Sequence, residues 1–191
     1  YSELLAPYLK NKGEFIAVTF SPDKLYSGDK REAYWSRVSL NYRKKMADKV
    51  LYGDVIFGSF QPSEPIELDN KQVDVALVIR ILHTWDEMGG MQSGLQELAK
   101  LVKKGGTLGI IQHRANKVSS IASMATQGYL DERYVIEVAE KAGFKLVASS
   151  EVNSNNKDTK DHPKGVYALP PTLAMGNIDR EKYLGIGESD R

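Results

Sequence analysis

Two nearly uninterrupted apolar runs, separated by a helix-like segment, constrain the fold of this chain most strongly. The first run spans residues 73–79, and the second spans residues 107–111. The segment between them closes at Lys103-Lys104-Gly105-Gly106, where glycine is expected to end a helix. Strands without polar alternation are usually buried on both faces, which occurs mainly in parallel sheets covered by helices. The pattern therefore predicts a βαβ unit within a parallel sheet.

The remaining segments continue the same alternation of helices and strands. Helical spacing of apolar residues predicts helices at residues 2–10, 30–49 and 131–142. Short apolar runs predict strands at residues 15–18, 55–58 and 144–152. Residues 61–65 and 115–128 are expected to be loops, the second one with a broken helix. Residues 153–191 show little periodicity and are predicted to form an irregular tail or lid. This order predicts an α/β fold, a three-layer α/β/α sandwich with right-handed crossovers.

Composition limits the classes of function. The chain has 191 residues, a formal net charge of +1 and no block of like charges, so one domain is expected and no nucleic-acid partner is indicated. It contains no cysteine, which excludes disulfides, thiolate metal sites and cysteine nucleophiles. No apolar run approaches the roughly 20 residues of a membrane span. A cytoplasmic protein is favoured, but the sequence begins at Tyr1 without methionine, so an upstream segment and export remain open.

Polar and aromatic residues follow the two apolar runs. Ligands in parallel α/β sheets bind beyond the carboxyl ends of the strands. Arg80, His83 and Trp85 follow the first run, and His113 and Arg114 follow the second. His83 is a candidate to orient or deprotonate a substrate, or it belongs to a purely structural turn. Arg80 either holds a carboxylate or pairs with a local acid.

The third histidine of the chain, His162, lies in the predicted tail. If the tail folds over the sheet edge, His83, His113 and His162 converge there. Three imidazoles are able to bind a metal ion, but their spacing is not the short helical type, so no metal site is predicted. A lid histidine that meets the substrate is the favoured interpretation of His162.

Taken in order, these segments resemble the class I S-adenosylmethionine-dependent methyltransferases. The residues that carry the resemblance are Val73–Leu77, His83-Thr84-Trp85, the helix Leu95–Val102, Lys104–Leu108 and Ala139–Phe144. The stretches from Lys157 to Thr172 and from Gly187 to Arg191 are similar to a bacterial group of predicted methyltransferases. The resemblance implies a mostly parallel, Rossmann-like sheet, S-adenosylmethionine as cofactor and a small-molecule methyl acceptor.

The family's glycine-rich loop and its last strand have no counterpart in this chain. The chain is therefore expected to be one methyltransferase-like domain, residues 1–191, truncated at both ends and lacking the first and last strands. The acids that usually bind the ribose and the adenine are replaced by Thr19-Phe20-Ser21 and Gly58-Ser59-Phe60. By position in the family pattern, the cofactor-binding residues are Thr19, Phe20, Gly58, Ser59, Phe60, Arg80 and Leu82.

The leading hypothesis is a methyltransferase acting on a small molecule, in which His83 and His113 are catalytic. Trp85, Arg114 and His162 would contact the substrate. The alternative is a degenerate methyltransferase-like domain that binds or scaffolds without catalysis, because the usual acids are missing. A nicotinamide-dependent enzyme is a third hypothesis, which would also require a glycine-rich fingerprint. Membrane partners are not expected, whereas exposed sheet edges would favour a homo-oligomer.

Overall fold

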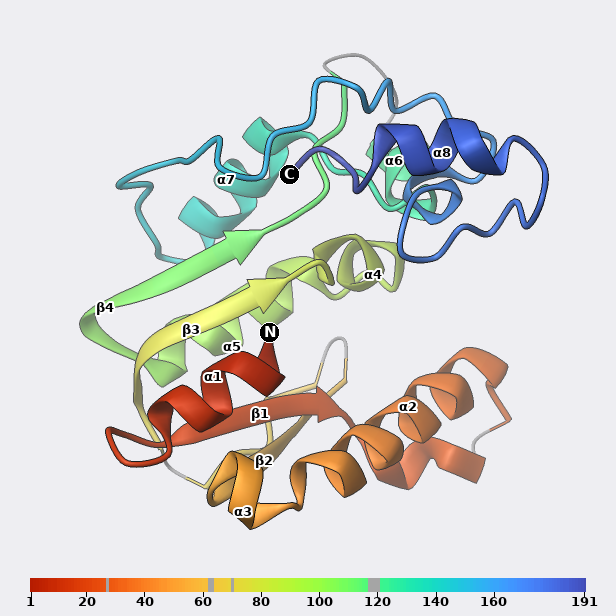
Figure 1. Ribbon diagram of the computed structural model, residues 1–191. Coiled ribbons are helices and arrows are strands. Elements are labelled where there is room, and N and C mark those ends of the chain that lie inside the picture. The colour runs from red at the N-terminus through yellow and green to blue at the C-terminus, as the bar shows by residue number, and fades with distance from the viewer. Residues whose placement is uncertain (27, 62–63, 70, 117–120) are drawn as a thin grey trace. The chain divides into compact units, whose positions relative to one another are not determined.

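The chain divides into two compact units, Tyr1–Lys71 and Gln72–Arg191. The structure, a computed structural model, describes residues 1–26, 28–61, 64–69, 71–116 and 121–191, and the side chains of residues 121–123 are not part of that description. Parts of the expected loops at residues 61–65 and 115–128 therefore lie outside the described residues. Figure 1 shows the helices and strands of each unit along the chain.

The first unit is built on two parallel strands, β1 (Phe15–Phe20) and β2 (Val55–Phe60). Three helices accompany them, α1 (Ser2–Leu9), α2 (Lys30–Met46) and α3 (Lys49–Tyr52), with a 3-10 turn η1 (Pro22–Tyr26) before α2. Ala6, Met46 and Tyr52, one from each helix, form a buried cluster on which strand residues of β1 and β2 pack. Both predicted strands of this unit are confirmed, each two residues longer than expected.

Two aspartate caps set the helix boundaries of the first unit. The Asp29 carboxylate accepts hydrogen bonds from the backbone N–H groups of Arg31 and Glu32 and starts α2. Asp48 accepts from the N–H groups of Val50 and Leu51 in the same way. The single helix predicted over residues 30–49 is therefore wrong at its end, because Asp48 begins a separate short helix.

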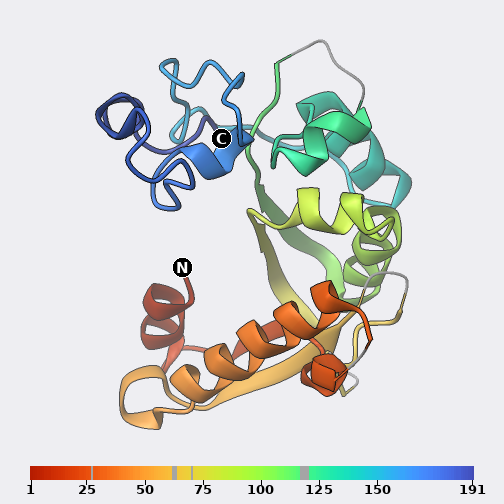
Figure 2. The same ribbon diagram turned by 90° about the vertical axis from the view of Figure 1, so that its right-hand side faces the viewer.

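The second unit contains the parallel strands β3 (Val73–Ile79) and β4 (Val102–Ile111). Between them lie α4 (Leu82–Glu87) and α5 (Met91–Leu101), and after them α6 (Ile121–Thr126) and α7 (Glu132–Lys141). Figure 2 shows these four helices on one side of β3 and β4, with the C-terminal segment on the other side of the strands' carboxyl ends. The central prediction, a βαβ unit with parallel strands, is confirmed.

The Lys-Lys-Gly-Gly segment has a different role from the predicted one. The helix α5 already ends at Leu101, and residues 103–106 lie inside β4. The pairing register shifts between Val73 and Val75, and Gly105 has φ +82°. Glycine adopts this left-handed conformation without a steric penalty, so the segment forms a bulge in the strand rather than a helix end.

The strand predicted at residues 144–152 is wrong. This segment pairs with no strand among the described residues, and Val147 and Val152 are 87% and 84% exposed. A strand requires a hydrogen-bonding neighbour and a buried face, and apolar residues alone supply neither. The described residues thus form a mixed α/β fold with two two-stranded parallel sheets, β1–β2 and β3–β4. The single sheet of a three-layer sandwich is not seen within them.

The tail beyond residue 153 contains more structure than its sequence predicts. It forms a 3-10 turn η2 (Gly165–Ala168) and the helix α8 (Arg180–Ile186). Ala168, Leu169 and Tyr183 make a buried cluster of their own. Among the described residues, no helix combines the length and the apolar character that a bilayer span requires.

Candidate functional site

The candidate site of the second unit begins at the carboxyl end of β3. The backbone N–H of Arg80 donates to the Ile111 carbonyl at 2.7 Å, which continues the pairing of β3 with β4. Arg80 then takes φ +57°, a left-handed conformation that is rare for a residue with a side chain. This turn starts α4 directly afterwards and buries Leu82 completely. Backbone strain of this kind is concentrated at functional sites.

His83 and His113 meet at this edge, as the sequence predicts. Both side chains are buried, and their ring centroids lie 5.7 Å apart. His83 Nδ1 lies 3.3 Å from Gln112 Nε2, and His83 Nε2 lies 3.3 Å from the hydroxyl of Tyr167. The parallel strands thus bring together two imidazoles, an amide and a phenol.

The tail fixes His113 from the other side. A hydrogen bond of 2.5 Å joins His113 Nδ1 to the hydroxyl of Ser189, which is itself buried. Burial, followed by the positive charge of Arg80 and the nearby His83 and Arg191, lowers the pKa of His113 to about 3. His113 is therefore neutral at physiological pH, and its low pKa makes it a weak proton acceptor.

Arg114, the next residue, is held by carboxylates. Its guanidinium donates to both oxygens of Glu151 at 2.8 and 2.6 Å and to both oxygens of Asp190 at 3.2 and 3.1 Å. Lys160 Nζ lies 2.7 Å from the same Asp190 carboxylate. Burial opposes ionisation of Asp190, but the hydrogen bonds from Arg114 and Lys160 outweigh it and lower its pKa to about 2. Arg114 therefore anchors the tail, and its contact with a substrate stays a prediction.

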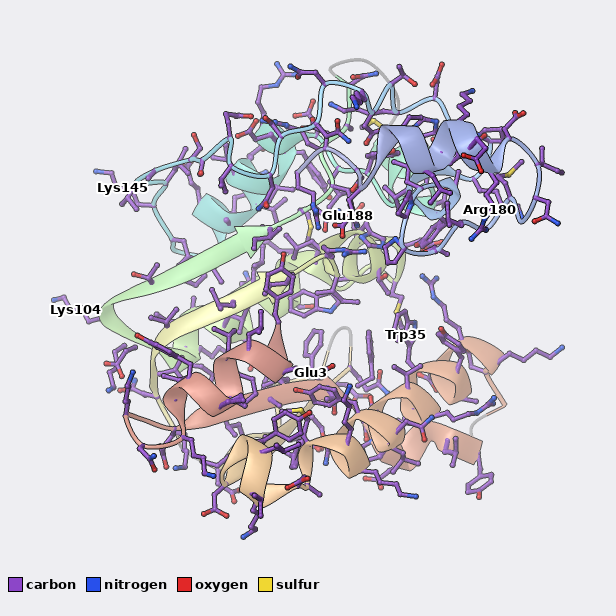
Figure 3. All side chains as sticks on the ribbon, in the orientation of Figure 1. Glu3, Trp35, Lys104, Lys145, Arg180 and Glu188 are labelled. Atoms are coloured by element: carbon purple, nitrogen blue, oxygen red, sulfur yellow. The ribbon has the colours of Figure 1, made fainter. Side chains whose placement is uncertain are left out.

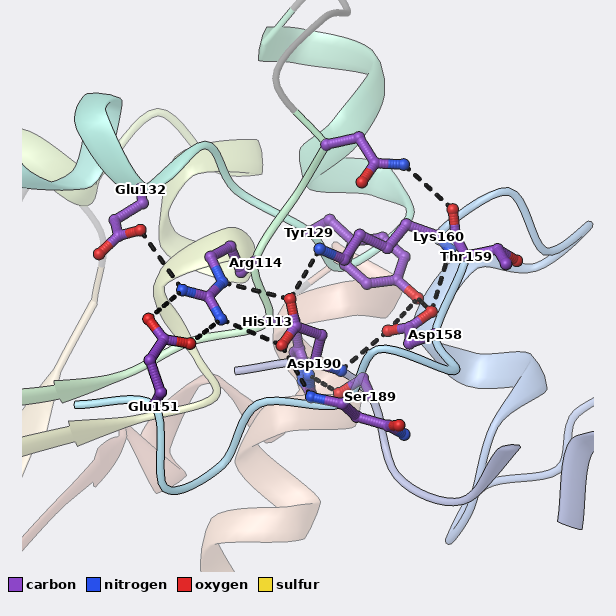
Figure 4. A network of polar contacts seen from close by, with 12 residues as sticks. His113, Arg114, Tyr129, Glu132, Glu151, Asp158, Thr159, Lys160, Ser189 and Asp190 are labelled. Carbon is purple, nitrogen blue, oxygen red and sulfur yellow. Dashed lines mark hydrogen bonds and ion pairs between the residues drawn. The ribbon is translucent and has the colours of Figure 1, made fainter. Parts of the chain in front are cut away.

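Asp158 connects His162 to the same network. Figure 4 shows Asp158 beside Tyr129 and Asp190. Its carboxylate accepts hydrogen bonds from the Tyr129 hydroxyl at 2.9 Å and from the backbone N–H of Asp190 at 2.9 Å, and it contacts His162 Nε2 at 2.9 Å. Burial and then the charge of Asp158 raise the pKa of Tyr129, so the phenol stays protonated and donates. All three histidines belong to one chain of contacts, because the Tyr129 ring also packs on His113.

The structure places the remaining predicted substrate residues in packed surroundings. Trp85 is buried within α4, and the ring of His162 packs edge-on against Tyr183. Within the described ranges, no group of three or more histidine or acidic side chains is arranged to hold a metal ion. Contact of Trp85 and His162 with a substrate stays a prediction.

In the first unit, the predicted cofactor residues lie together at the carboxyl ends of β1 and β2. Thr19 is the register partner of Ser59, and Phe20 is the partner of Phe60. Arg43 of α2 connects the first pair, because its guanidinium donates to Thr19 Oγ1 at 3.1 Å and to Ser59 Oγ at 3.1 Å. This contact was not predicted, since Arg43 stands in a run of helical basic residues. A cation therefore lies beside the two hydroxyl groups at these strand ends.

Phe20 and Phe60 are both buried, and Phe20 stacks on Trp35 of α2 with centroids 5.2 Å apart. A Cβ atom at Gly58 would approach a main-chain oxygen to 3.0 Å, so this position favours glycine for packing reasons. Gln61, which directly follows Phe60 at the end of β2, is 5% exposed, and neither of its amide atoms has a hydrogen-bonding partner among the described residues. Buried polar groups are nearly always paired, so the Gln61 amide is a candidate to bind a ligand. Sequence reasoning overlooked Gln61.

The chain matches no protein-family model, and no curated protein matches it at a significant level. Among solved structures, it resembles the crystal structure of NcsB1, an O-methyltransferase from neocarzinostatin biosynthesis, in complex with S-adenosyl-L-homocysteine and 1,4-dihydroxy-2-naphthoic acid. The two chains share 17% sequence identity with a TM-score of 0.48, and the match covers 76% of this chain and 47% of the other. This chain thus spans about half the length of that methyltransferase.

Proposed function

We propose that this protein is an S-adenosylmethionine-dependent methyltransferase that acts on a small-molecule acceptor. The observation that carries the proposal is the buried pair His83 and His113 beyond the carboxyl ends of the parallel strands β3 and β4. This is the edge at which parallel α/β sheets bind ligands. The sequence motifs of the second unit, from Val73 to Leu108, resemble those of the methyltransferase family, and this resemblance does not depend on the geometry of the histidine pair.

The first unit offers residues that fit the adenosine part of the cofactor. The Gln61 amide presents a donor and an acceptor, the combination that pairs with the edge of adenine, and both atoms lack a partner among the described residues. The hydroxyl groups of Thr19 and Ser59 accept from Arg43 and keep their own hydrogens for donation. When bound, S-adenosylmethionine supplies the methyl group from its sulfonium centre.

In the second unit, His83 is assigned the role of orienting the acceptor. Methyl transfer is an in-line displacement, whose rate depends chiefly on the alignment of the reacting atoms. His83 is buried, and contacts with Gln112 and Tyr167 hold its ring on both sides. His113, with its pKa of about 3, contributes a neutral hydrogen-bonding ring beside it rather than a proton acceptor.

The test is calorimetric titration of S-adenosylhomocysteine into the protein. Binding is expected, and Gln61→Ala is expected to weaken it about tenfold, which corresponds to the roughly 1.4 kcal/mol of one or two lost hydrogen bonds. Gln96→Ala is the matched control, because Gln96 is the same residue type on the exposed surface of α5. Absence of binding to the wild-type protein would contradict the proposal.

A binding domain without catalysis is the second candidate, favoured by the contact of Arg43 with Thr19 and Ser59. An arginine donates where the family's carboxylate would accept from the ribose hydroxyl groups, so cofactor affinity would be reduced. Binding of S-adenosylhomocysteine without methyl transfer from labelled S-adenosylmethionine to any acceptor in a small-molecule panel would support this candidate.

A further inference from the structure

Arg43 of α2 carries a positive charge that no carboxylate among the described residues neutralises. Its guanidinium is partly buried, and its hydrogen-bonding partners are all uncharged: Thr19 Oγ1, the Gly58 carbonyl and Ser59 Oγ, at 2.8 to 3.2 Å. The guanidinium carbon also lies 5.3 Å from the centroid of the Phe57 ring. Partly buried charges are usually paired, so a guanidinium held by neutral groups is a candidate to bind an anion.

The two hydroxyl groups beside Arg43 have hydrogens left to donate. A hydroxyl oxygen that accepts from a guanidinium directs its own hydrogen elsewhere. Thr19 Oγ1 and Ser59 Oγ both accept from Arg43, and neither hydroxyl donates to an acceptor in the described part of the chain. The three side chains therefore present an excess of donors, which suits a ligand group with several acceptor oxygens.

An acidic residue, Glu67, is paired with Ser59 in the sheet. The pairing uses two backbone hydrogen bonds, of 3.0 and 2.8 Å, and Glu67 itself is exposed. Within the described ranges, the Glu67 carboxylate forms no ion pair with Arg43 or with another cation. The positive charge of Arg43 is therefore not compensated from this side either.

These groups lie at the end of the sheet where ligands are expected. Thr19 and Ser59 are the second-last residues of β1 and β2, and parallel α/β sheets bind ligands beyond the carboxyl ends of their strands. Gln61, two residues after Ser59, is buried with both amide atoms unpaired among the described residues, an observation independent of the guanidinium. Figure 3 shows Trp35 on α2, and its ring stacks on the last residue of β1. The strand ends thus combine a cation, two hydroxyl donors, an unpaired amide and an aromatic wall.

We propose that Arg43, Thr19 and Ser59 form a binding site for the phosphate group of a small molecule. The guanidinium and the two hydroxyl groups match the several acceptor oxygens of a phosphate, and its negative charge would neutralise Arg43. The phosphate is either inorganic phosphate or the ester of an adenine nucleotide, whose base would meet Gln61. The site goes beyond the proposed methyltransferase function and does not depend on it, because S-adenosylmethionine contains no phosphate.

The first experiment is an NMR titration of the ¹⁵N-labelled protein with inorganic phosphate, with chloride at equal ionic strength as the reference. The Arg43 Nε–H signal, identified by its loss in Arg43→Gln, and the backbone signals of Thr19 and Ser59 are expected to shift and saturate. Arg43→Gln keeps an amide donor and removes the charge, so it should weaken phosphate binding about tenfold. Thr19→Val removes one hydroxyl and keeps the shape of the side chain, so it should weaken binding about threefold.

Arg37→Gln is the matched control, because Arg37 is an exposed arginine of the same helix. This variant should bind phosphate as the wild type does. Equal weakening in the two arginine variants, or equal shifts with chloride and phosphate, would overturn the site. Urea denaturation of each variant distinguishes a lost site from a lost fold. If Arg43→Gln does not fold, Thr19→Val decides, because unchanged phosphate binding in it would overturn the site.

A second titration distinguishes the two sources of the phosphate group. Binding of adenosine 2′-monophosphate at least about tenfold more tightly than inorganic phosphate would assign a nucleotide, whereas equal affinities would assign free phosphate. Both outcomes support the site, but adenosine that binds as tightly as its monophosphate would overturn it. Binding of S-adenosylhomocysteine is measured separately, so failure of the methyltransferase proposal is distinguishable from failure of this one.

Discussion

Replacing Asp190 with asparagine tests whether the polar network holds the tail on the second unit. Asp190→Asn keeps the size of the side chain and removes its charge. The pKa of Asp190 is lowered from 3.8 to about 2, chiefly by Arg114 and Lys160 acting against the cost of burial. A lowering of this size corresponds to about 2 kcal/mol of stability at neutral pH, an upper limit because solvent screening reduces it.

The sign of the pH dependence follows from the same shift. Because the folded-state pKa lies below the unfolded value, the ionised carboxylate stabilises the fold above about pH 4. This contribution is lost as the pH falls from about 4 to about 2, where Asp190 is protonated in both states. The difference in stability between wild type and Asp190→Asn should therefore be largest at neutral pH and shrink within this window.

The assay is urea denaturation followed by circular dichroism, at pH 7 and in steps down to about pH 3. Glu151→Gln is the control, because Glu151 pairs with the same arginine but its side chain is 64% exposed, whereas that of Asp190 is 8% exposed. The control should lose far less stability, since exposed ion pairs contribute little. Equal losses in the two variants, or a difference that does not change with pH, would refute the reasoning.

Two further substitutions test the local structure by the same denaturation assay. Gly165→Ala should lower the free energy of unfolding by about 3 kcal/mol or more, because the new Cβ would lie 2.1 Å from a main-chain oxygen. Gly176→Ala is the control, because Gly176 has a similar φ and a Cβ there would meet no atom within 4 Å, so it should cost about 1 kcal/mol. Equal losses of stability in the two variants would contradict the packing argument. Asp131→Ala should cost about 1 kcal/mol, because the carboxylate accepts from the first N–H groups of α7, and an unchanged midpoint would show that this cap does not stabilise the helix.

The strands illustrate what a local pattern is able to predict. Residues 73–79 form a strand as predicted. The expected burial of both faces is not seen, because Val75 and Leu77 are 56% and 49% exposed and only Val78 is buried. Residues 144–152 also contain several apolar residues but form no strand, because a strand also requires a neighbour with free backbone groups. A local pattern contains no information about such a neighbour.

The candidate site shows the same division. The convergence of Arg80, His83 and His113 follows from the rule that the carboxyl ends of parallel strands meet at one edge. The partners of these residues were not predictable. Ser189 reaches His113 across 76 sequence positions, and the tail that carries it has no periodicity to reveal its path.

The sequence by itself determined the parallel strands and the edge at which polar residues gather, because these depend on local pattern and on the handedness of the chain. The tertiary structure decided the chemical state of those residues. His113, for example, is neutral because it is buried among cationic groups. Protonation depends on the distances between groups remote in sequence, which only the folded chain fixes.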